Sequence, residues 1–325
     1  MEMMMKKNNV VIGTRSSKLA LWQAEWVKAE LQRMNPGLEI ELNKIKTTGD
    51  KILDVPLAKV GGKGLFVKEI EEALLRGEAD LAVHSMKDVP TEFPESLYLA
   101  VICEREDPRD AFIAQSKEHG AKSFKDLPQG ATIGTSSLRR SCQLLSKRPD
   151  LKIAQLRGNL ETRFRKLDEG QFDAMILATA GVKRLGWQQR ITEVIEPEIS
   201  LPAIGQGAVG IECRINDEFI NQLIAPLNHK ETSICVRAER ALLKRLQGGC
   251  QVPIAAYATI KDGRLIMDGL VGSVTGDRII KEHLEGNIED AETIGISLGE
   301  NLLSKGADKI LAEVYGREIT PIDAP

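Results

Sequence analysis

Two stretches of the chain follow the same order of strand, turn, helix and strand. Residues 10–42 begin VVIGTRSSKLALWQAEW, and residues 131–156 begin ATIGTSSLRRSCQLL. In each, an apolar run ends in Gly-Thr, serines precede apolar residues at helical spacing, and a proline-containing turn leads to another apolar run. The likeness continues in GEADLAVHS and GQFDAMILA, where an acidic residue precedes a further apolar run. This duplication predicts two α/β lobes built on one β-α-β plan.

A change of pattern near residue 230 predicts a third, smaller domain. The stretch ETSICVRAERALLKRL has the spacing of an amphipathic helix, and three apolar runs separated by KDG and TGD turns follow it. The segments EREDPRDAF and SLPAIGQGA have the character of two connections between the lobes, so a hinged cleft is expected. The expected boundaries are 7–104 with 205–226 for lobe one, 109–200 for lobe two and 230–325 for a C-terminal α+β domain.

Length, composition and charge exclude several classes of protein. A chain of 325 residues, 42% hydrophobic and 28% charged, has ordinary globular proportions and is too long for one small core. The opening MEMMMKKNNVVIG lacks the apolar region and small-residue cleavage site of a secretory signal. A net charge of −3 implies no general affinity for nucleic acid. We expect a cytoplasmic protein with no membrane or nucleic-acid partner.

The cysteines and histidines argue against a disulfide framework and against a metal site. The five cysteines are scattered without a C-x-x-C pair, and none of the four histidines lies at helical spacing from another. Cys103, Cys142, Cys213 and Cys235 are expected to be buried as small hydrophobic residues. Cys250 differs, because in LQGGCQVPIA two glycines precede it and leave room for a bulky group beside the sulfur.

Basic residues gather where the lobes are expected to bind a ligand. Residues 131–190 hold twelve Lys and Arg against five Asp and Glu, a count that a solvated surface would also explain. Several arginines, however, follow an expected strand or begin the next helix, where helix N-termini attract anions. Because guanidinium groups match carboxylate or phosphate, we expect a ligand with several such groups. The candidates are Arg15, Ser17, Ser137, Arg139, Arg140, Arg157, Arg163 and Arg184.

Nucleotides are disfavoured as this ligand. A Walker loop ending at Lys63 would need glycine at position 57, which is Leu57, and a hydroxyl residue at position 64, which is Gly64. The segment GQGAVG at 205–210 matches a dinucleotide pattern, but it leads into an expected strand rather than a helix. A polycarboxylate is therefore the better expectation.

Asp88 brings a carboxylate into this basic setting. In HSMKDVP it follows an expected strand of lobe one and stands next to Lys87, so its side chain is expected to face the cleft. One role is acid–base catalysis or stabilisation of a cation. The alternative is an Asx turn that leads into Pro90.

Long motifs throughout the chain resemble those of the porphobilinogen deaminase family, also called hydroxymethylbilane synthases. The motifs are IGTRSSKLALWQA, TTGD, LAKVGGKGLFVKE, DLAVHSMKDVP, CEREDPRDAF, IGTSSLRR, LRGN, LPAIGQGAVGIECR and AERALLKRLQGGCQVPIAA. The resemblance implies two lobes like those of periplasmic binding proteins, with a cysteine-bearing C-terminal domain. It also implies a transferase that condenses four porphobilinogen molecules head to tail, with loss of ammonia, into the linear tetrapyrrole hydroxymethylbilane.

The resemblance also assigns roles to particular residues. Cys250 would form a thioether to a dipyrromethane cofactor, and Asp88 would be the catalytic carboxylate that contacts pyrrole N–H groups, helps protonate the departing amine and stabilises the cation left behind. The implied cofactor contacts are Asp88, Lys87, Ser137, Arg139, Arg140, Arg157, Arg163 and Arg184. The implied substrate contacts are Arg15, Ser17, Arg157, Arg163, Arg184, Gln206, Lys59, Lys63 and Phe66. The glycines from Gly61 to Gly64 match the family's mobile loop, no metal is implied, and the family favours a monomer.

Two other interpretations stay open from the sequence. Two hinged lobes with an anion-binding cleft also suit a solute receptor or an effector-binding regulator, which would need neither a reactive cysteine nor an essential aspartate. A cysteine-dependent hydrolase would need a histidine partner for Cys250. The nearest histidines in sequence, His229 and His283, lie in no suggestive motif.

Overall fold

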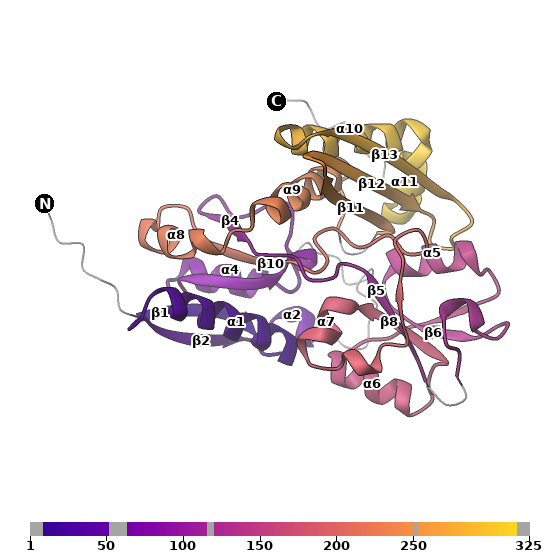
Figure 1. The fold of residues 1–325 in the computed structure, drawn as a ribbon, viewed down its shortest axis with the longest axis horizontal. Helices are drawn as coiled ribbons and strands as arrows, with labels where there is room; N and C mark the ends of the chain where they lie inside the picture. The colour runs from indigo at the N-terminus through magenta and orange to yellow at the C-terminus, as the bar shows by residue number, and fades with distance from the viewer. Residues whose placement is uncertain (1–8, 52–63, 116–119, 250–251, 317–325) are drawn as a thin grey trace, which may run out of the picture. The chain divides into compact units, whose positions relative to one another are not determined.

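The computed structural model describes residues 9–51, 64–115, 120–249 and 252–316, and Figure 1 shows its elements along the chain. It separates into two compact units. The first comprises Met1–Asp54, Gly62–Glu104 and Val209–His229, and the second comprises Val55–Gly61, Arg105–Ala208 and Lys230–Pro325. No helix in the described ranges is long and apolar enough to cross a membrane.

The first unit is built on a five-stranded sheet of order β2-β1-β3-β10-β4. Strands β1, β2 and β3 run parallel, whereas β10 runs antiparallel to both of its neighbours, β3 and β4. The strand β10 comes from far along the chain and enters the sheet between two early strands. The bounds are Asn9–Arg15 for β1, Glu39–Ile45 for β2, Leu81–Ser85 for β3, Leu97–Ile102 for β4 and Val209–Arg214 for β10.

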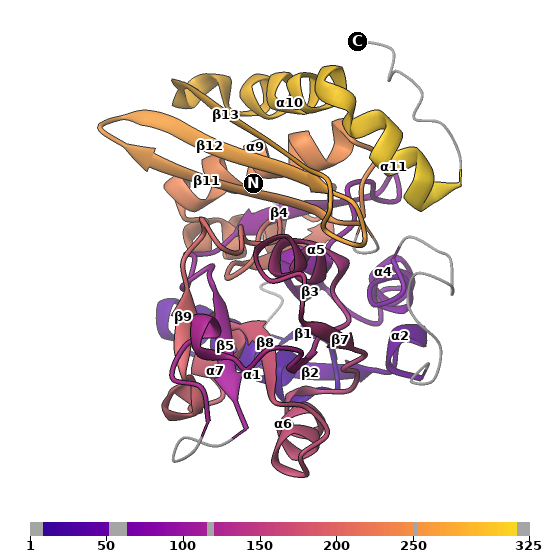
Figure 2. The same ribbon diagram turned by 90° about the vertical axis from the view of Figure 1, so that its right-hand side faces the viewer.

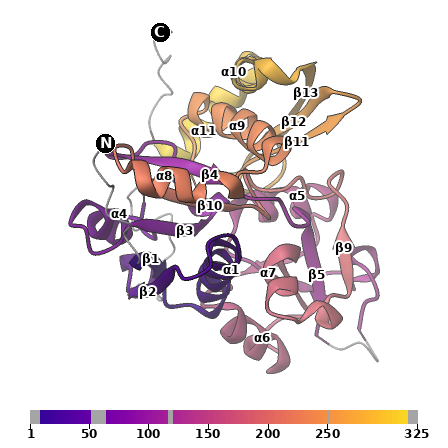
Figure 3. The ribbon, with the colours of Figure 1, turned by 60° about the vertical axis from the view of Figure 1, so that its left-hand side comes forward.

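Helices cover both faces of this first sheet, as Figure 3 shows. Helices α1 (Lys18–Met34) and α8 (Glu218–Ile224) place Val27, Leu31 and Ile220 against one face. Helix α4 (Lys68–Leu75) packs Ile70 and Leu74 against the other. The short helix α2 (Thr48–Lys51) follows β2. Buried residues therefore run almost continuously along β3 and β10, as expected of strands at the centre of a three-layer α/β structure.

The second unit repeats this plan in a sheet of order β7-β6-β8-β5-β9. Here too three adjacent strands, β7, β6 and β8, are parallel, and β5 runs antiparallel to β8 and β9. The two orders correspond position by position, so the predicted duplication is confirmed. The bounds are Asp110–Ala114 for β5, Thr132–Gly134 for β6, Lys152–Ala154 for β7, Ala174–Ala178 for β8 and Glu193–Ile195 for β9.

Three helices enclose this second sheet. Helix α5 (Leu138–Lys147) packs Leu144 on one face, and helices α6 (Leu160–Asp168) and α7 (Thr179–Arg184) pack Phe164, Leu167 and Val182 on the other. Each parallel strand ends near the start of one of these helices. Side chains at the strand ends and helix starts therefore gather at one edge of the sheet.

The C-terminal part of the second unit is a three-stranded antiparallel sheet of order β11-β12-β13. Helices α9 and α10 cover one face of it, as Figure 2 shows, and Leu242 and Leu298 belong to their shared core. On the other face, Ala255 and Leu270 pack with Cys142 of α5. The bounds are Lys230–Arg245 for α9, Ile254–Lys261 for β11, Arg264–Gly272 for β12, Ile279–Asn287 for β13, Ala291–Leu302 for α10 and Asp308–Tyr315 for α11. The predicted α+β composition of this part is confirmed.

Candidate functional site

Asp88 ends a short 3₁₀ helix, Met86–Asp88, that directly follows β3. Ser85 is anchored to Gln23 of α1 by hydrogen bonds of 3.0 and 3.1 Å. Met86 is buried against Gly210 of β10, where a Cβ atom would come within 2.4 Å of Met86 Sδ. The half-buried Asp88 carboxylate has no hydrogen-bond or ion-pair partner within the described ranges, so the Asx turn is not formed there. Asp88 is therefore carried on a well-anchored turn with its acceptor oxygens available.

Arg15, at the end of β1, is held by a carboxylate that sequence reasoning did not single out. Its guanidinium pairs with Asp50 and lies 4.3 Å from the centre of the Phe66 ring. Asp50 also accepts a hydrogen bond of 2.8 Å from Thr47 Oγ1. Burial opposes the ionisation of Asp50, but Arg15 and Thr47 outweigh it, so the pKa of Asp50 lies below its usual value. The structure therefore brings together two predicted ligand contacts, Arg15 and Phe66, and adds Asp50 as their neighbour.

The other predicted residues of the first unit have different surroundings. Ser17 is the N-cap of α1, and its hydroxyl oxygen accepts a hydrogen bond of 3.3 Å from the Ala20 amide. Lys87 is half-buried next to Asp88. Lys59, Lys63 and Cys250 lie outside the described residues, as do Gly61 and Gly62 of the predicted loop.

Arg139 and Arg140 of α5 are buried around one carboxylate, that of Asp110 at the start of β5. Arg139 Nη1 donates to Asp110 Oδ2 at 2.5 Å, and Arg140 Nη2 donates to Asp110 Oδ1 at 2.8 Å. Ser200 and Gln206 donate to the same carboxylate at 2.8 and 2.9 Å. Burial opposes the ionisation of Asp110, but the two guanidinium groups outweigh it and hold its pKa well below the usual range. The two arginines therefore have an internal counter-ion, which the sequence argument for ligand anions did not foresee.

This buried group retains an excess of positive charge. Two guanidinium groups face one carboxylate, and Arg139 Nε is buried without a hydrogen-bond partner. A buried donor of this kind is costly unless an acceptor reaches it. The arrangement therefore suits an additional anion, such as a carboxylate of a bound cofactor.

The other predicted residues of the second unit lie before or after Arg139 and Arg140 in the sequence. Ser137 is the N-cap of α5 and accepts a hydrogen bond of 3.4 Å from the Arg140 amide. Arg157, Arg163 and Arg184 are half-buried: Arg157 lies between β7 and α6, Arg163 belongs to α6, and Arg184 ends α7. Arg163 Nε donates to the Gly158 carbonyl at 2.8 Å, and Arg184 Nη2 donates to the Gly207 carbonyl at 2.6 Å.

A second buried carboxylate, Glu239 of α9, ties the segment around Gln206 to the C-terminal domain. Arg105 donates to Glu239 through both terminal nitrogens, at 2.6 and 3.1 Å, and through Nε to the Gln206 carbonyl at 2.8 Å. The Gly205 and Ala258 amides donate to the same carboxylate at 2.7 and 2.9 Å. Because α9 leads toward position 250, this network links the helix before Cys250 to the arginine cluster of α5.

The described cysteines behave as structural residues. Cys103, Cys142, Cys213 and Cys235 are free and buried, as predicted. Burial raises the pKa of Cys142, Cys213 and Cys235 to about 12. These three thiols are therefore poor nucleophiles at neutral pH.

A buried ionisable cluster lies behind the Asp88 turn, and nothing in the sequence pattern indicated it. His84 Nε2 of β3 lies 3.0 Å from Glu212 Oε2 of β10, and both side chains are buried. Glu71 of α4 is the third member. Burial and the charge of Glu212, opposed by His84, raise the pKa of Glu71 to about 7. The carboxyl of Glu71 is thus largely protonated below neutral pH.

Glu71→Gln is expected to stabilise the protein at high pH only. A carboxyl whose pKa rises from 4.5 to about 7 on folding contributes stability that is lost as the pH rises through that interval. Glutamine keeps the shape and cannot ionise, so the melting temperature of the variant should exceed that of the wild type by about 2 to 4 °C at pH 8.5. The two proteins should melt together at pH 4, below the ordinary pKa of 4.5, where the carboxyl is largely protonated in both states. Thermal unfolding at both pH values measures the difference, and an equal shift at each pH would contradict the raised pKa.

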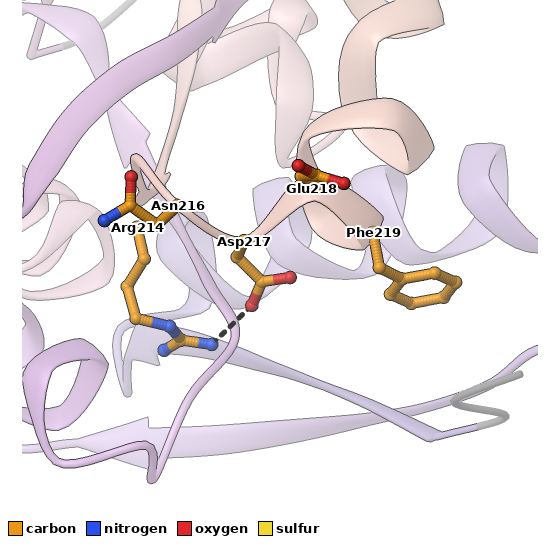
Figure 4. Close-up of a pocket in the computed structure, with 5 residues that line it drawn as sticks. All are labelled: Arg214, Asn216, Asp217, Glu218 and Phe219. Carbon is orange, nitrogen blue, oxygen red and sulfur yellow. Dashed lines mark hydrogen bonds and ion pairs between the residues drawn. The ribbon is translucent and has the colours of Figure 1, made fainter. Parts of the chain in front are cut away.

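One surface hollow of the first unit lies away from Asp88. Arg214, Asn216, Asp217, Glu218 and Phe219 line it, and Arg214 pairs with Asp217 at 2.8 Å (Figure 4). In the ladder between β10 and β3, Val209 pairs with Ser85 and Cys213 with Leu81, so Arg214 and Asp88 lie at opposite ends of these strands. The hollow is therefore no part of the candidate site. The described residues contain no group of three or more His, Cys, Asp or Glu side chains that could hold a metal ion.

Comparisons with known proteins agree with these observations. The family described as "Porphobilinogen deaminase, dipyromethane cofactor binding domain" matches residues 10–222, and "Porphobilinogen deaminase, C-terminal domain" matches residues 233–304. Porphobilinogen deaminase from Geobacter sulfurreducens is 60% identical over 97% of this chain and 98% of its own length. The protein of the same name from Geobacter metallireducens is 61% identical over 95% of each chain.

Among solved structures, the methionine-binding protein MetQ aligns with 68% of this chain and 89% of its own, at 17% identity and a TM-score of 0.44. The family matches cover both the lobe sequences and the C-terminal domain, and the two relatives extend over nearly the whole length. From these matches, the chain belongs to the porphobilinogen deaminase family.

Proposed function

We propose that this protein condenses four porphobilinogen molecules head to tail and, with one water, releases hydroxymethylbilane and four molecules of ammonia. The observation that carries the proposal is the Asp88 carboxylate, which is half-buried, firmly anchored and without a partner among the described residues. In a member of the porphobilinogen deaminase family, this is the group with the chemistry that loss of ammonia requires.

Asp88 would act on the reacting pyrrole. Its oxygens accept hydrogen bonds from pyrrole N–H groups, and its negative charge stabilises the cation that remains on the substrate when ammonia departs. The same carboxyl, when protonated, helps to protonate the departing amine. An internal cation bound tightly to Asp88 would have neutralised this charge before the substrate arrived.

The arginines would hold the acetate and propionate groups of the substrate. We assign this role to Arg15, Arg157, Arg163 and Arg184, because guanidinium forks match carboxylates. Further proposed substrate contacts are Ser17, Gln206, Lys59, Lys63 and Phe66. For Arg15, Asp50 would keep the guanidinium in one orientation beside the Phe66 ring.

Arg139 and Arg140 would hold the dipyrromethane cofactor, which is covalently tethered to Cys250. The unpartnered Arg139 Nε and the single carboxylate between two guanidinium groups suit its carboxylates. Lys87, Ser137, Arg157, Arg163, Arg184 and Asp88 are the other proposed contacts. When bound, the dipyrromethane supplies the pyrrole position to which the first substrate unit is joined. The buried Asp110 keeps both guanidinium groups in place.

We also propose the domain boundaries of 7–104 with 205–226, 109–200 and 230–325, and a monomer in the cytoplasm that binds no nucleic acid. The free, buried cysteines support the reducing compartment. The net charge of −3 supports the absence of nucleic-acid binding.

The intact mass of the denatured protein tests the tether. The wild type should exceed its sequence mass by two linked pyrrole units and should release ammonia from porphobilinogen, whereas Cys250→Ser should show neither. Cys213→Ser is a matched control, because a serine hydroxyl can replace the hydrogen bond of 3.0 Å from Cys213 to Asn221. It should retain both the added mass and the activity. A wild type that binds porphobilinogen without consuming it would instead indicate a receptor.

A further inference from the structure

The end of β3 is fixed by a series of contacts that leads up to Asp88. His84 pairs with Glu212 at 3.0 Å, Ser85 is bonded to Gln23, and Met86 packs on the backbone of β10 at Gly210. Two of these contacts join the segment to β10, and the third joins it to α1. Together they determine where the next two residues, Lys87 and Asp88, can lie.

The pair of His84 and Glu212 is the unusual member of this series. The two side chains are 6% and 0% exposed, and they join neighbouring strands, because His84 lies opposite Gly210 in the ladder with β10. A buried polar pair costs desolvation that well-packed apolar side chains would avoid. Unlike an apolar contact, the hydrogen bond of the pair is directional, so it fixes the orientation of the two side chains relative to each other.

Glu71 closes the cluster from the helix side. Its Oε1 atom and Glu212 Oε1 are both buried without a hydrogen-bond partner in the described ranges. Helix α4, which carries Glu71, packs on β1, β3 and β10. No hydrogen bond within the described ranges joins Glu71 to His84 or Glu212, so the direct contact of the cluster runs between β3 and β10 alone.

We propose that His84 and Glu212 are positioning residues that hold the turn bearing Lys87 and Asp88 in its reactive geometry. The inference rests on the proposed function, in which Asp88 is the catalytic carboxylate. A displacement of that carboxylate by a fraction of its hydrogen-bond length would lower the rate of the chemical step and leave the binding of substrate carboxylates to the arginines unchanged.

A pair of variants separates this role from a contribution to stability alone. The double variant His84→Leu with Glu212→Met removes both buried polar groups, so its fold should be as stable as that of the wild type. Its kcat should nevertheless fall about tenfold while KM stays within about twofold. His84→Gln can place an amide nitrogen near the position of Nε2, so it should keep kcat within about twofold of the wild type.

The measurement is steady-state ammonia release by holoenzymes whose cofactor content has been matched by intact mass. A stable double variant with the kcat of the wild type would overturn the inference and leave the proposed function intact. Equal loss of kcat in the double variant and in His84→Gln would also overturn it, because the hydrogen bond would then not be the cause. A wild type that releases no ammonia would contradict the proposed function and the inference together.

Discussion

Asp88→Asn is expected to fold as the wild type does and to release ammonia from porphobilinogen about 10²- to 10⁴-fold more slowly. Asparagine keeps the size of the side chain and one acceptor oxygen, but it carries no charge to stabilise a cation and no proton to give to the departing amine. The turn itself should not move, because its contacts belong to Ser85 and Met86 and not to the Asp88 carboxylate.

The chain offers a matched control for this change. Asp126 ends a second 3₁₀ helix, Phe124–Asp126, in which a lysine also precedes the aspartate, but its carboxylate is exposed and accepts a hydrogen bond of 2.9 Å from Ser123. Asp126→Asn should therefore leave the rate unchanged. Ammonia release and thermal unfolding of both variants give the comparison. An Asp88→Asn protein with more than a tenth of the wild-type rate would remove Asp88 from its proposed role.

Asp110→Asn is expected to lower the free energy of unfolding by about 3 to 5 kcal/mol. The variant leaves Arg139 and Arg140, which are 4% and 6% exposed, without their shared counter-ion. Because the two guanidinium groups outweigh the effect of burial and hold the pKa of Asp110 well below its usual range, the carboxylate stays ionised at neutral pH. A carboxylate whose pKa is lowered on folding stabilises the protein at every pH above its ordinary pKa, and this stabilisation is lost only in strong acid. The decrease in the free energy of unfolding caused by Asp110→Asn should therefore be constant from about pH 6 to pH 9.

Asp168→Asn serves as the control for the loss of a carboxylate. Asp168 pairs with Arg190 at 2.5 Å, but its side chain is 50% exposed, and such surface pairs contribute about 0 to 1 kcal/mol. Urea unfolding of both variants, followed at two pH values, measures the difference. If Asp110→Asn lowered the free energy of unfolding no more than Asp168→Asn does, the result would contradict the role of Asp110 as the counter-ion of Arg139 and Arg140.

Local patterns were sufficient to predict the elements of the fold. The Gly-Thr pairs lie close to the predicted strand ends, since β6 ends at Gly134 and β1 continues through Gly13 and Thr14 to Arg15. The polar run after DLAVHS predicted the turn that bears Asp88. The interpretation of GQGAVG as the start of a strand is confirmed by β10, which begins at Val209. Each of these predictions depended on residues within one turn or one strand, where spacing and glycine content are informative.

The pairs that hold the site together were not predictable in the same way. Asp110 meets Arg139 and Arg140 across 29 and 30 residues, and His84 meets Glu212 across 128. No periodicity relates such residues, because their proximity follows from the order of strands in a sheet. The sequence therefore indicated which arginines are present and where they begin a helix, but not which of them are already neutralised by a carboxylate of the protein itself.

The position of β10 affects the order in which the two sheets can form during synthesis on the ribosome. This strand separates β3 from β4 in the first sheet, although both of those strands are synthesised more than a hundred residues earlier. At ordinary rates of translation β10 follows β3 on the order of ten seconds later. All five strands of the second sheet are synthesised within that interval, so a chain that ends before Val209 contains every strand of the later sheet but lacks one strand of the earlier sheet. The sheet of the first unit, although its synthesis begins first, can be completed only after β10 has been made.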